Sequence, residues 1–536
     1  MGSGAGGAAL AFTLVRAGLR VVLLEKGPYY REHDLVHDEL RFRRLDGFVP
    51  LVQDEPHVVV RRGRAAPTRE GWTACCVGGG TVHMGASLYR MHPDDFRLSR
   101  LVGQPAGTSP LDWPLGYDAL ERYYDQAEAL LGVSGEAGAN PFEPARVPYP
   151  LPPLLRHPIG DRLDRACRTA GFHPFPTPRG ILSRPYAGRP ACAYCPLCVG
   201  YGCEIGAKSS AEIVFLRPAL ATGHLELRTE AMAFEVAVDG RGRASGVRWF
   251  DTRTPALRGA AREQRAKVVV LACGAVETAR LMLLSRSPRF PHGLANDEGQ
   301  VGRNLTVGLG ATGRGEFPPL DDDSAALAIP FAGVSLQDWL RPERAPVPRG
   351  GTVQLVIPER SPIGTLERLA HLDGGLVWGR ELKRRARRHR DVLHVEFETF
   401  CDFWPHPGAR VELDARVDRY GVPVARIHAD VRPENVAASA FVAGRAAELL
   451  RQARAENVRI EKLAGDTLYL QHGTARMGAD PRTSVVDVDG RAHGVPNLYV
   501  ADGAALPATG CVPPTLTIVA NALRIGERLL AARSQP

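Results

Sequence analysis

The sequence predicts an α/β fold, α+β overall, that joins a doubly wound, Rossmann-like nucleotide-binding domain to a domain built on an antiparallel sheet. Three observations predict it. The chain opens on a glycine-rich fingerprint over residues 2–7. The segment 267–272 is apolar after its first residue, as a parallel strand buried on both faces should be. Between residues 310 and 430, segments of alternating polarity predict antiparallel strands with one wet face.

The fingerprint reads Gly2-Ser3-Gly4-Ala5-Gly6-Gly7 and leads into an expected helix over 8–19 and a strand over 20–24. Its glycines let backbone N–H groups approach a pyrophosphate, and a helix N-terminus favours the negative charge. The strand ends at Glu25, and an acidic residue at about that spacing can bind a ribose diol. The spacing therefore predicts a dinucleotide site. Because the central strand that should precede Gly2 is missing, we expect the natural start to lie upstream.

The remaining elements are expected in the following order. Helices are predicted over 117–131, 276–285 and 435–455, and strands over 225–228, 233–238, 246–250, 267–272, 353–356 and 393–398. From this order we predict a discontinuous nucleotide-binding domain over 1–100, 205–310 and 466–536, a covering segment over 101–204 and a substrate domain over 311–465.

Composition bounds the function classes. The chain has 536 residues, 44% of them hydrophobic, and a net charge of +8. No apolar stretch reaches the ~18–20 residues of a membrane span, and no signal-peptide pattern opens the chain, so we expect no integral membrane segment and a cytoplasmic location. Nothing resembling a nucleic-acid-binding groove accompanies the positive charge, so we expect no nucleic-acid partner. The basic run Arg380–Arg390 is interpreted either as a solvated helix face or as a docking patch for an acidic partner.

The C-terminal region carries the most specific pattern. It runs Gln471-His472-Gly473-Thr474-Ala475-Arg476-Met477-Gly478, continues through 483–487 and 490–503, and closes on Pro513-Pro514-Thr515-Leu516-Thr517-Ile518. With 78–80, 271–275 and 301–305, it resembles the flavin-dependent glucose–methanol–choline (GMC) oxidoreductase family. Within that family, 202–208 is similar to gluconate dehydrogenase flavoprotein subunits. Residues 80–82 and 514–518 are similar to sugar dehydrogenases of aminoglycoside biosynthesis.

The resemblance implies FAD as the cofactor. It places Glu25 on the adenosine ribose, the opening glycines on the pyrophosphate, Asp502 and Gly503 near the pyrophosphate and ribityl chain, and Thr515 near the isoalloxazine. The full set of expected cofactor-binding residues is Gly2, Ser3, Gly4, Gly7, Glu25, Gly79, Gly80, Thr81, His83, Asp502, Gly503, Pro514 and Thr515. His83 stands where some sugar-oxidising relatives carry a histidine bonded to the flavin. The alternative is a histidine that lines the flavin pocket without a bond.

The resemblance also implies the catalytic base. In the family a histidine at the position of His472 takes the hydroxyl proton, and imidazole suits this because its ordinary pKa of ~6.5 lies near working pH. The family places Asn or His just before the equivalent of Pro514-Thr515, whereas this chain has Pro513, which offers no donor. Gln471 or a residue of the other domain is therefore a candidate to hold the substrate oxygen. Alternatively, the protein binds flavin without oxidising an alcohol.

Four cysteines form a cluster, Cys192, Cys195, Cys198 and Cys203. Thiolates at such spacing suit an iron–sulfur cluster or tetrahedral zinc. Free thiols or disulfides are the competing interpretation. An iron–sulfur centre beside a flavin would favour a dehydrogenase over an oxygen-using oxidase.

Together these features predict an FAD-dependent dehydrogenase that oxidises a hydroxyl of a sugar, sugar acid or amino sugar. Its electrons would pass to a non-NAD acceptor, with an electron-acceptor protein as a possible partner. The alternatives are an oxidase of the same fold that uses oxygen, and the flavin-binding protein without alcohol turnover.

Overall fold

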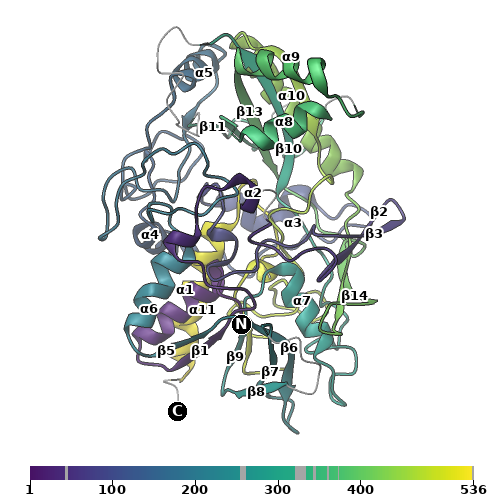
Figure 1. The fold of residues 1–536 in the computed structure, drawn as a ribbon. Coiled ribbons are helices and arrows are strands. Elements are labelled where there is room, and N and C mark those ends of the chain that lie inside the picture. Colours follow the sequence, from purple (N-terminus) through teal and green to yellow (C-terminus); the bar gives the residue numbers. More distant parts are fainter. Residues whose placement is uncertain are drawn as a thin grey trace.

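The computed structural model describes residues 1–536 except 43–45, 254–260, 320–332, 342–345, 359–360, 372–373 and 534–536. The chain is a mixed helix and sheet structure with both parallel and antiparallel pairing, as the sequence predicts. In Figure 1 both ends of the chain lie in the lower half, whereas β10, β13 and α10 occupy the upper half.

The lower half brings together segments that lie far apart in the sequence. Helix α1 (Ala5–Arg16) packs against α11 (Thr515–Arg533) (Figure 1). Strand β1 (Val21–Leu24) pairs in parallel with β5 (Leu225–Arg228), and β9 (Val269–Leu271) with β17 (Leu498–Val500). The opening glycines and the C-terminal motif therefore belong to one structural unit.

Met1 and Gly2 lie between the two parallel pairs, where the sequence predicts a central strand. The Met1 amino group donates to the carbonyl of Val270 at 2.8 Å, and the N–H of Ala272 donates to the Met1 carbonyl at 2.9 Å. The N–H of Gly2 donates to the carbonyl of Leu24 at 2.9 Å. These two residues thus bond to β9 on one side and to β1 on the other.

Most elements expected from the sequence are present, with shifted ends. The expected helices are α1, α4 (Asp118–Leu131), α7 (Ala275–Leu284) and α10 (Pro433–Gln452). Helix α1 starts earlier than expected, within the fingerprint itself. Gly6 and Gly7, in the first turn of this helix, lie too close to neighbouring backbone to carry a side chain: a Cβ on Gly6 would lie 1.7 Å from the carbonyl oxygen of Ala501.

The upper half is built on a six-stranded sheet of order β16-β10-β13-β12-β11-β4 with antiparallel pairing throughout. Its strands are β4 (Phe175–Pro176), β10 (Leu309–Phe317), β11 (Val334–Leu336), β12 (Gly351–Val356), β13 (Leu393–Cys401) and β16 (Glu456–Lys462). Helix α10 packs against β10, β12 and β13. The opposite face of these strands forms a wall of the cavity described below.

Two further sheets complete the fold. Strands β14 (Arg410–Val417), β15 (Pro423–His428), β2 (His57–Arg61) and β3 (Arg64–Thr68) form one, and β6 (Ala231–Val238), β7 (Ala244–Asp251) and β8 (Arg262–Arg265) form the other. In the first sheet, β2 lies in the range predicted for nucleotide binding and pairs with β15, which lies in the range predicted for the substrate domain.

The other helices are α2 (Glu39–Phe42), α3 (Leu98–Val102), α5 (Pro158–Thr169), α6 (Arg217–Ala221), α8 (Pro362–Ala370) and α9 (Gly379–Arg390). Shorter helical turns are η1 (Glu32–Asp34), η3 (Gly79–Thr81), η4 (Pro93–Arg97), η5 (Glu212–Leu216) and η8 (Gly503–Ala505).

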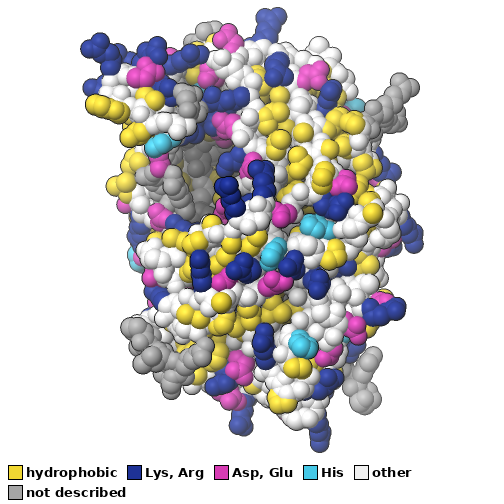
Figure 2. All heavy atoms as spheres, turned by 90° about the vertical axis from the view of Figure 1, so that its right-hand side faces the viewer, with side chains coloured by type: hydrophobic (Ala, Val, Ile, Leu, Met, Phe, Trp, Pro, Cys, Tyr) yellow, Lys and Arg dark blue, Asp and Glu magenta, His cyan; other side chains and the backbone are white. Residues whose placement is uncertain are grey.

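The basic run falls on α9, none of whose residues is buried. Glu381 forms ion pairs with Arg384 and Arg385 along the helix, so part of the charge is neutralised locally. Basic side chains are spread over the face drawn in Figure 2, with acidic ones among them. Among the described residues, no helix combines the length and apolar character that crossing a bilayer requires.

Candidate active site

A cavity of about 740 Å³ lies where the two halves meet. Most of the predicted site residues line it. These are Gly2, Ser3, Gly4, Glu25, Gly79, Gly80, Thr81, His83, Gln471, Asp502, Gly503, Pro514 and Thr515. Gly7, His472 and the four clustered cysteines are not on its wall.

Three helices begin at this wall. Ala5 of α1, Ala275 of α7 and Thr515 of α11 all line the cavity. The first-turn N–H groups of a helix have no partner within the helix and carry a partial positive charge. The convergence of three such ends suits an anionic group such as a pyrophosphate.

The opening glycines are required by close backbone contacts. Gly2 has a φ of +84°, and a Cβ there would lie 2.1 Å from the carbonyl oxygen of Ala272. A Cβ on Gly7 would lie 1.9 Å from the carbonyl oxygen of Gly2. Gly7 therefore supports the loop from behind, while Gly4 faces the cavity with only the Cα of Gly79 nearby, at 3.9 Å from its would-be Cβ.

Glu25 lies at the end of β1 with its carboxylate held by the fingerprint. One oxygen accepts hydrogen bonds from the N–H and hydroxyl of Ser3 at 3.0 and 2.6 Å, and the other accepts from the N–H of Gly27 at 2.9 Å. Burial raises the pKa of Glu25, and these hydrogen bonds oppose the rise. The carboxylate is thus oriented at the cavity wall, as a group that binds a ribose diol should be.

Asp502 joins the C-terminal motif to α7. Its carboxylate accepts hydrogen bonds from the N–H of Gly274 at 2.8 Å, the hydroxyl of Thr278 at 2.6 Å and the N–H of Ala504 at 2.8 Å. Burial raises the pKa of this carboxyl. Asp502 therefore positions the start of α7 at the cavity in addition to lining it.

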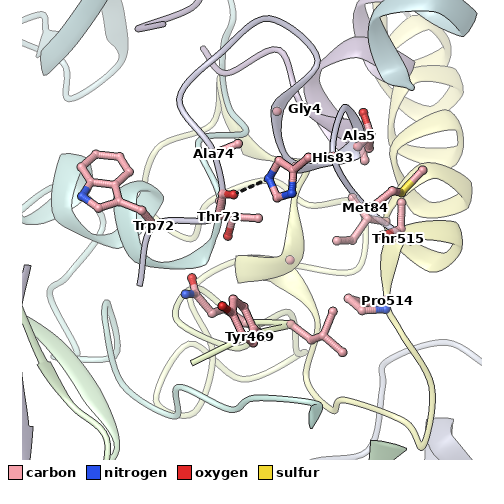
Figure 3. A pocket seen from close by; sticks show the side chains of 18 of the residues that line it. Gly4, Ala5, Trp72, Thr73, Ala74, His83, Met84, Tyr469, Pro514 and Thr515 are labelled. Atoms are coloured by element: carbon pink, nitrogen blue, oxygen red, sulfur yellow. Dashed lines mark hydrogen bonds between the residues drawn. The ribbon is translucent and has the colours of Figure 1, made fainter. Parts of the chain in front are cut away.

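His83 lies inside the cavity, close to Thr73 and Met84 (Figure 3). Its Nε2 is 2.9 Å from the carbonyl oxygen of Thr73, and its ring stacks on Phe48 with centroids 5.1 Å apart. Burial lowers the pKa of His83 to about 4, so the ring is neutral at neutral pH. Because Nε2 donates to Thr73, Nδ1 is the nitrogen that carries the free lone pair.

The C-terminal motif presents Tyr469, Leu470 and Gln471 to the cavity. The Gln471 amide nitrogen donates to the carbonyls of Gly71 and Leu468, both at 2.9 Å, which leaves only its carbonyl oxygen for a ligand. Leu470 has a φ of +60°, a strained conformation for a branched side chain.

His472 is fully buried next to this wall. Its backbone bonds to Thr306, and neither ring nitrogen makes a hydrogen bond of ordinary geometry within the described chain. Burial lowers the pKa of His472 to about 3, and the Leu470 carbonyl opposes this only weakly. The imidazole is neutral, as a base must be, but its ring does not line the cavity.

Pro513 lines the cavity at the end of a strongly held segment. The Arg349 guanidinium lies between Asp95 and Asp402, with Nε 3.1 Å from Asp402 and Nη2 3.3 Å from the sulfur of Cys511. The hydroxyl of Thr509 donates to Asp402 at 2.8 Å. This buried cluster ties the approach to Pro513 to the loops around η4 and β13.

The sheet of the upper half contributes cavity residues that were not predicted from the sequence. Thr312 of β10, Gln354 of β12, and Glu396, Glu398 and Phe400 of β13 all line the cavity. The alternation in 393–398 predicted a polar face for this strand. It carried no signal that the face opens on an internal cavity instead of bulk water.

Residues that line the cavity near Glu25 were also not predicted from the sequence. Trp72, Lys26 and Glu277 line it beside Glu25. Glu277 accepts from Nε2 of His57 at 3.0 Å, and the His57 ring stacks on Trp72 with centroids 4.6 Å apart. No sequence pattern marked these residues, because they come from three separate segments.

The cysteine cluster lies next to the cavity. Val199 and Gly200 of this loop line the wall, and the N–H of Gly200 donates to the carbonyl of His83 at 2.7 Å. No disulfide bond joins any of the ten cysteines, all of which the structure describes, so the disulfide interpretation is not met. No three of the clustered sulfurs, all of which the structure describes, lie within 4.8 Å of one another. A tetrahedral zinc ion with Zn–S bonds of about 2.3 Å needs sulfurs about 3.8 Å apart, so a zinc site is not preassembled. A multi-iron cluster spreads its cysteine ligands more widely than a single zinc ion does.

The residues present fit FAD. Three helix N-termini, an oriented carboxylate at Glu25 and glycines that leave the backbone bare match what a pyrophosphate and a ribose require. The fit is judged from these helix ends, this carboxylate and these glycines, and not from any bound group.

Comparisons with known proteins agree with this fit. Two GMC oxidoreductase family models match residues 72–309 and 405–522. A paromamine 6'-oxidase from Streptomyces fradiae is 35% identical over 98% of this chain and 89% of its own length. A 6'''-hydroxyparomomycin C oxidase from Streptomyces lividus is 33% identical over 99% of this chain and 90% of its own length. Among solved structures, an FAD-dependent oxidoreductase from Chaetomium thermophilum has a TM-score of 0.62 at 15% identity, covering 99% of this chain and 98% of that one, which supports the fold.

Proposed function

The chain belongs to the GMC oxidoreductase family and is an oxidoreductase acting on CH–OH groups, and from this premise we propose that it oxidises a hydroxyl of a sugar, sugar acid or amino sugar. The observation that carries the proposal is the single cavity that joins the nucleotide cradle to a polar wall of the substrate half. Glu25, at one end, suits a ribose; Gln354 and Glu398, at the other, suit a polyhydroxylated substrate.

When bound, FAD accepts the hydride that leaves the carbinol carbon. The chain's own residues do the rest. The loop at Gly2–Gly4 and the starts of α1, α7 and α11 hold the cofactor's anionic part. The carbonyl oxygen of the Gln471 side chain can accept a hydrogen bond from a substrate hydroxyl. Its amide nitrogen cannot donate to an alkoxide, since its N–H groups already donate to Gly71 and Leu468.

For the proton acceptor we propose His472. It follows Gln471 directly on the chain, its ring is neutral, and both its nitrogens are without a strong hydrogen bond. Its action requires the ring to turn towards the cavity, and the strained Leu470 backbone lies at the point where such a turn would begin.

A second candidate is His83, favoured by one observation: its ring already lines the cavity, with Nδ1 uncommitted. The same nitrogen is the candidate for a covalent bond to the flavin, and one nitrogen cannot serve both roles. Flavin that stays with the protein after denaturation would assign His83 to the bond and remove it as a base.

The route of the electrons is also proposed. A non-NAD acceptor is favoured, and the cysteine loop that contacts the cavity at Val199 and Gly200 is the proposed site of an iron–sulfur centre. Iron and sulfide analysis of the purified protein, with the variant Cys198→Ser as control, tests the centre. Metal content that is absent, or unchanged in the variant, rejects it.

The function is tested on the FAD-loaded protein. Anaerobic mixing with a panel of neutral sugars, sugar acids and amino sugars should bleach the flavin with at least one class. Peroxide release under air, compared with dye reduction without air, separates an oxidase from a dehydrogenase. A flavin that no member bleaches would favour the alternative without alcohol turnover, in which Pro513 leaves the site without its second polar residue.

A further inference from the structure

Glu396 and Glu398 stand side by side on the cavity face of β13. Alternate residues of a strand share a face, so these two and Phe400 point to the same side, about 7 Å apart along the strand. Val395 and Phe397 point to the other side, which α10 covers, and are fully buried. Because Val395 and Phe397 are packed under α10, β13 is held with the two carboxylates facing the cavity.

Little positive charge from the described residues is paired with these two carboxylates. Within the described chain, the side chain of Glu398 makes no hydrogen bond or ion pair. Glu396 lies 3.4 Å from Arg314, but Arg314 makes a closer pair with Glu461, at 2.6 Å. Four other cations line the cavity: Lys26, Arg179, Arg280 and Lys462. Lys26 forms an ion pair with Glu55, and Arg280 with Glu277 and Asp418.

The electrostatics of the two carboxyls agree with this geometry. Burial raises the pKa of Glu398, the charge of Glu396 raises it further, and Arg179 lowers it by less. Burial likewise raises the pKa of Glu396 against the opposing effect of Arg314. Both carboxylates thus lack a full counter-charge from the protein.

Gln354 gives an independent indication of a polar ligand. It is 2% exposed, and its carbonyl oxygen accepts hydrogen bonds from the hydroxyls of Ser87 at 2.8 Å and Tyr89 at 3.0 Å. Its amide NH₂ group makes no hydrogen bond with any described residue, although the side chain lines the cavity. Gln354 is the direct cross-strand neighbour of Glu398. One row of the wall thus offers an unused donor next to an unpaired acceptor.

We propose that Glu396 and Glu398 bind ammonium groups of the substrate, so that the enzyme selects amino sugars over neutral sugars and sugar acids. This rests on the proposed function, since it specifies the substrate class for the same cavity. A substrate ammonium supplies each carboxylate with the cation that the protein withholds, through charge-assisted hydrogen bonds. A substrate carboxylate would instead meet like charge, which gives selection by repulsion. Gln354 donates to a neighbouring hydroxyl of the same ligand.

The test measures binding separately from turnover. The FAD-loaded enzyme is titrated by calorimetry with paromamine and with its per-N-acetylated form, in which the amines carry no charge. We expect the charged form to bind roughly 10- to 100-fold more tightly, the range for hydrogen bonds to charged groups. Glu398→Gln and Glu396→Gln keep the size of the side chain, and each should reduce that preference by about 10-fold or more. Glu448→Gln, on the exposed side of α10, is the matched control and should leave both affinities unchanged.

Equal affinity of the wild-type enzyme for the two ligands overturns the proposal, whether or not the variants fold. A preference that survives in both glutamine variants also overturns it. The outcome is distinguishable from failure of the proposed function. Selective binding without flavin bleaching would support the ammonium site and reject oxidation of the sugar. Bleaching without selective binding would support oxidation and reject the ammonium site.

Discussion

The two walls of the cavity are built from different kinds of sequence. The nucleotide wall uses contiguous backbone: residues 2–6 supply the glycine loop and the first turn of α1, and their carboxylate partner follows at Glu25. The substrate wall uses side chains from separate strands, such as Gln354 of β12 and Glu398 of β13. A ligand shared by a whole family is held by a local motif, whereas a ligand particular to one enzyme is held by residues that only the sheet brings together. This contrast explains why one wall could be read from the sequence and the other could not.

The largest effect should come from breaking the nucleotide wall. In Gly7→Ala, the new Cβ would lie 1.9 Å from the carbonyl oxygen of Gly2, and backbone cannot move aside cheaply. We expect loss of FAD, hence of all turnover, and a loss of about 1–3 kcal/mol of stability. The flavin-to-protein absorbance ratio and the melting temperature measure both.

Gly444→Ala is the control for that change. Gly444 lies within α10, and nothing lies within 4 Å of its would-be Cβ. Alanine favours a helix by up to about 1 kcal/mol over glycine, so stability should be equal or higher and FAD content unchanged. Full FAD content in Gly7→Ala would show that the fingerprint does not depend on this packing.

The next effect concerns the catalytic base. The C-terminal motif favours His472, whereas the lining of the cavity favours His83. His472→Ala should lower kcat by roughly 10²- to 10⁴-fold, the usual contribution of a general base, while FAD is retained. Since burial lowers the pKa of His472 to about 3, the base is neutral at every pH above about 5, and kcat/KM should show no rise that belongs to it there. Steady-state rates as a function of pH measure this.

His83→Ala is the paired variant, because its ring lines the cavity. A large loss of kcat in His83→Ala with little loss in His472→Ala would reassign the base to the cavity wall. His472 would then have a structural role in the C-terminal motif.

The smallest effect on turnover is expected for Asp402, whose protonation changes stability and which lies in the buried cluster with Arg349 and Asp95. Burial raises the pKa of Asp402 from 3.8 to about 6. The folded state therefore holds this proton more tightly than the unfolded state. The resulting stabilisation is complete below about pH 4 and is lost as the pH rises through 6, by up to roughly 3 kcal/mol.

Asp402→Asn should remove that pH dependence, because the amide keeps the acceptor for Thr509 but carries no charge. Relative to the wild type, the variant should gain stability between pH 4.5 and 7.5, as measured by denaturant unfolding. A difference between the two proteins that stays constant over this range would contradict the buried titration.

Particular residues show where sequence reasoning held and where it stopped. The GMC resemblance, the α/β class and the helices now seen as α1, α4, α7 and α10 are confirmed. The roles of His472, His83 and the four cysteines stay predictions. The close packing of Gly6 against the Ala501 carbonyl was missed because it joins residues almost 500 positions apart.

The nucleotide half could be predicted from the chain alone, because its requirements are local: glycines without a Cβ, a helix start behind them, and an acidic residue at the end of the next strand. The surroundings of the polar face of β13 could be seen only in the folded protein. A period of two residues shows that Glu396 and Glu398 share a face, but whether that face meets bulk water or a cavity depends on what stands opposite. Here the opposite wall is the nucleotide cradle, and long-range packing alone brings the two within one cavity.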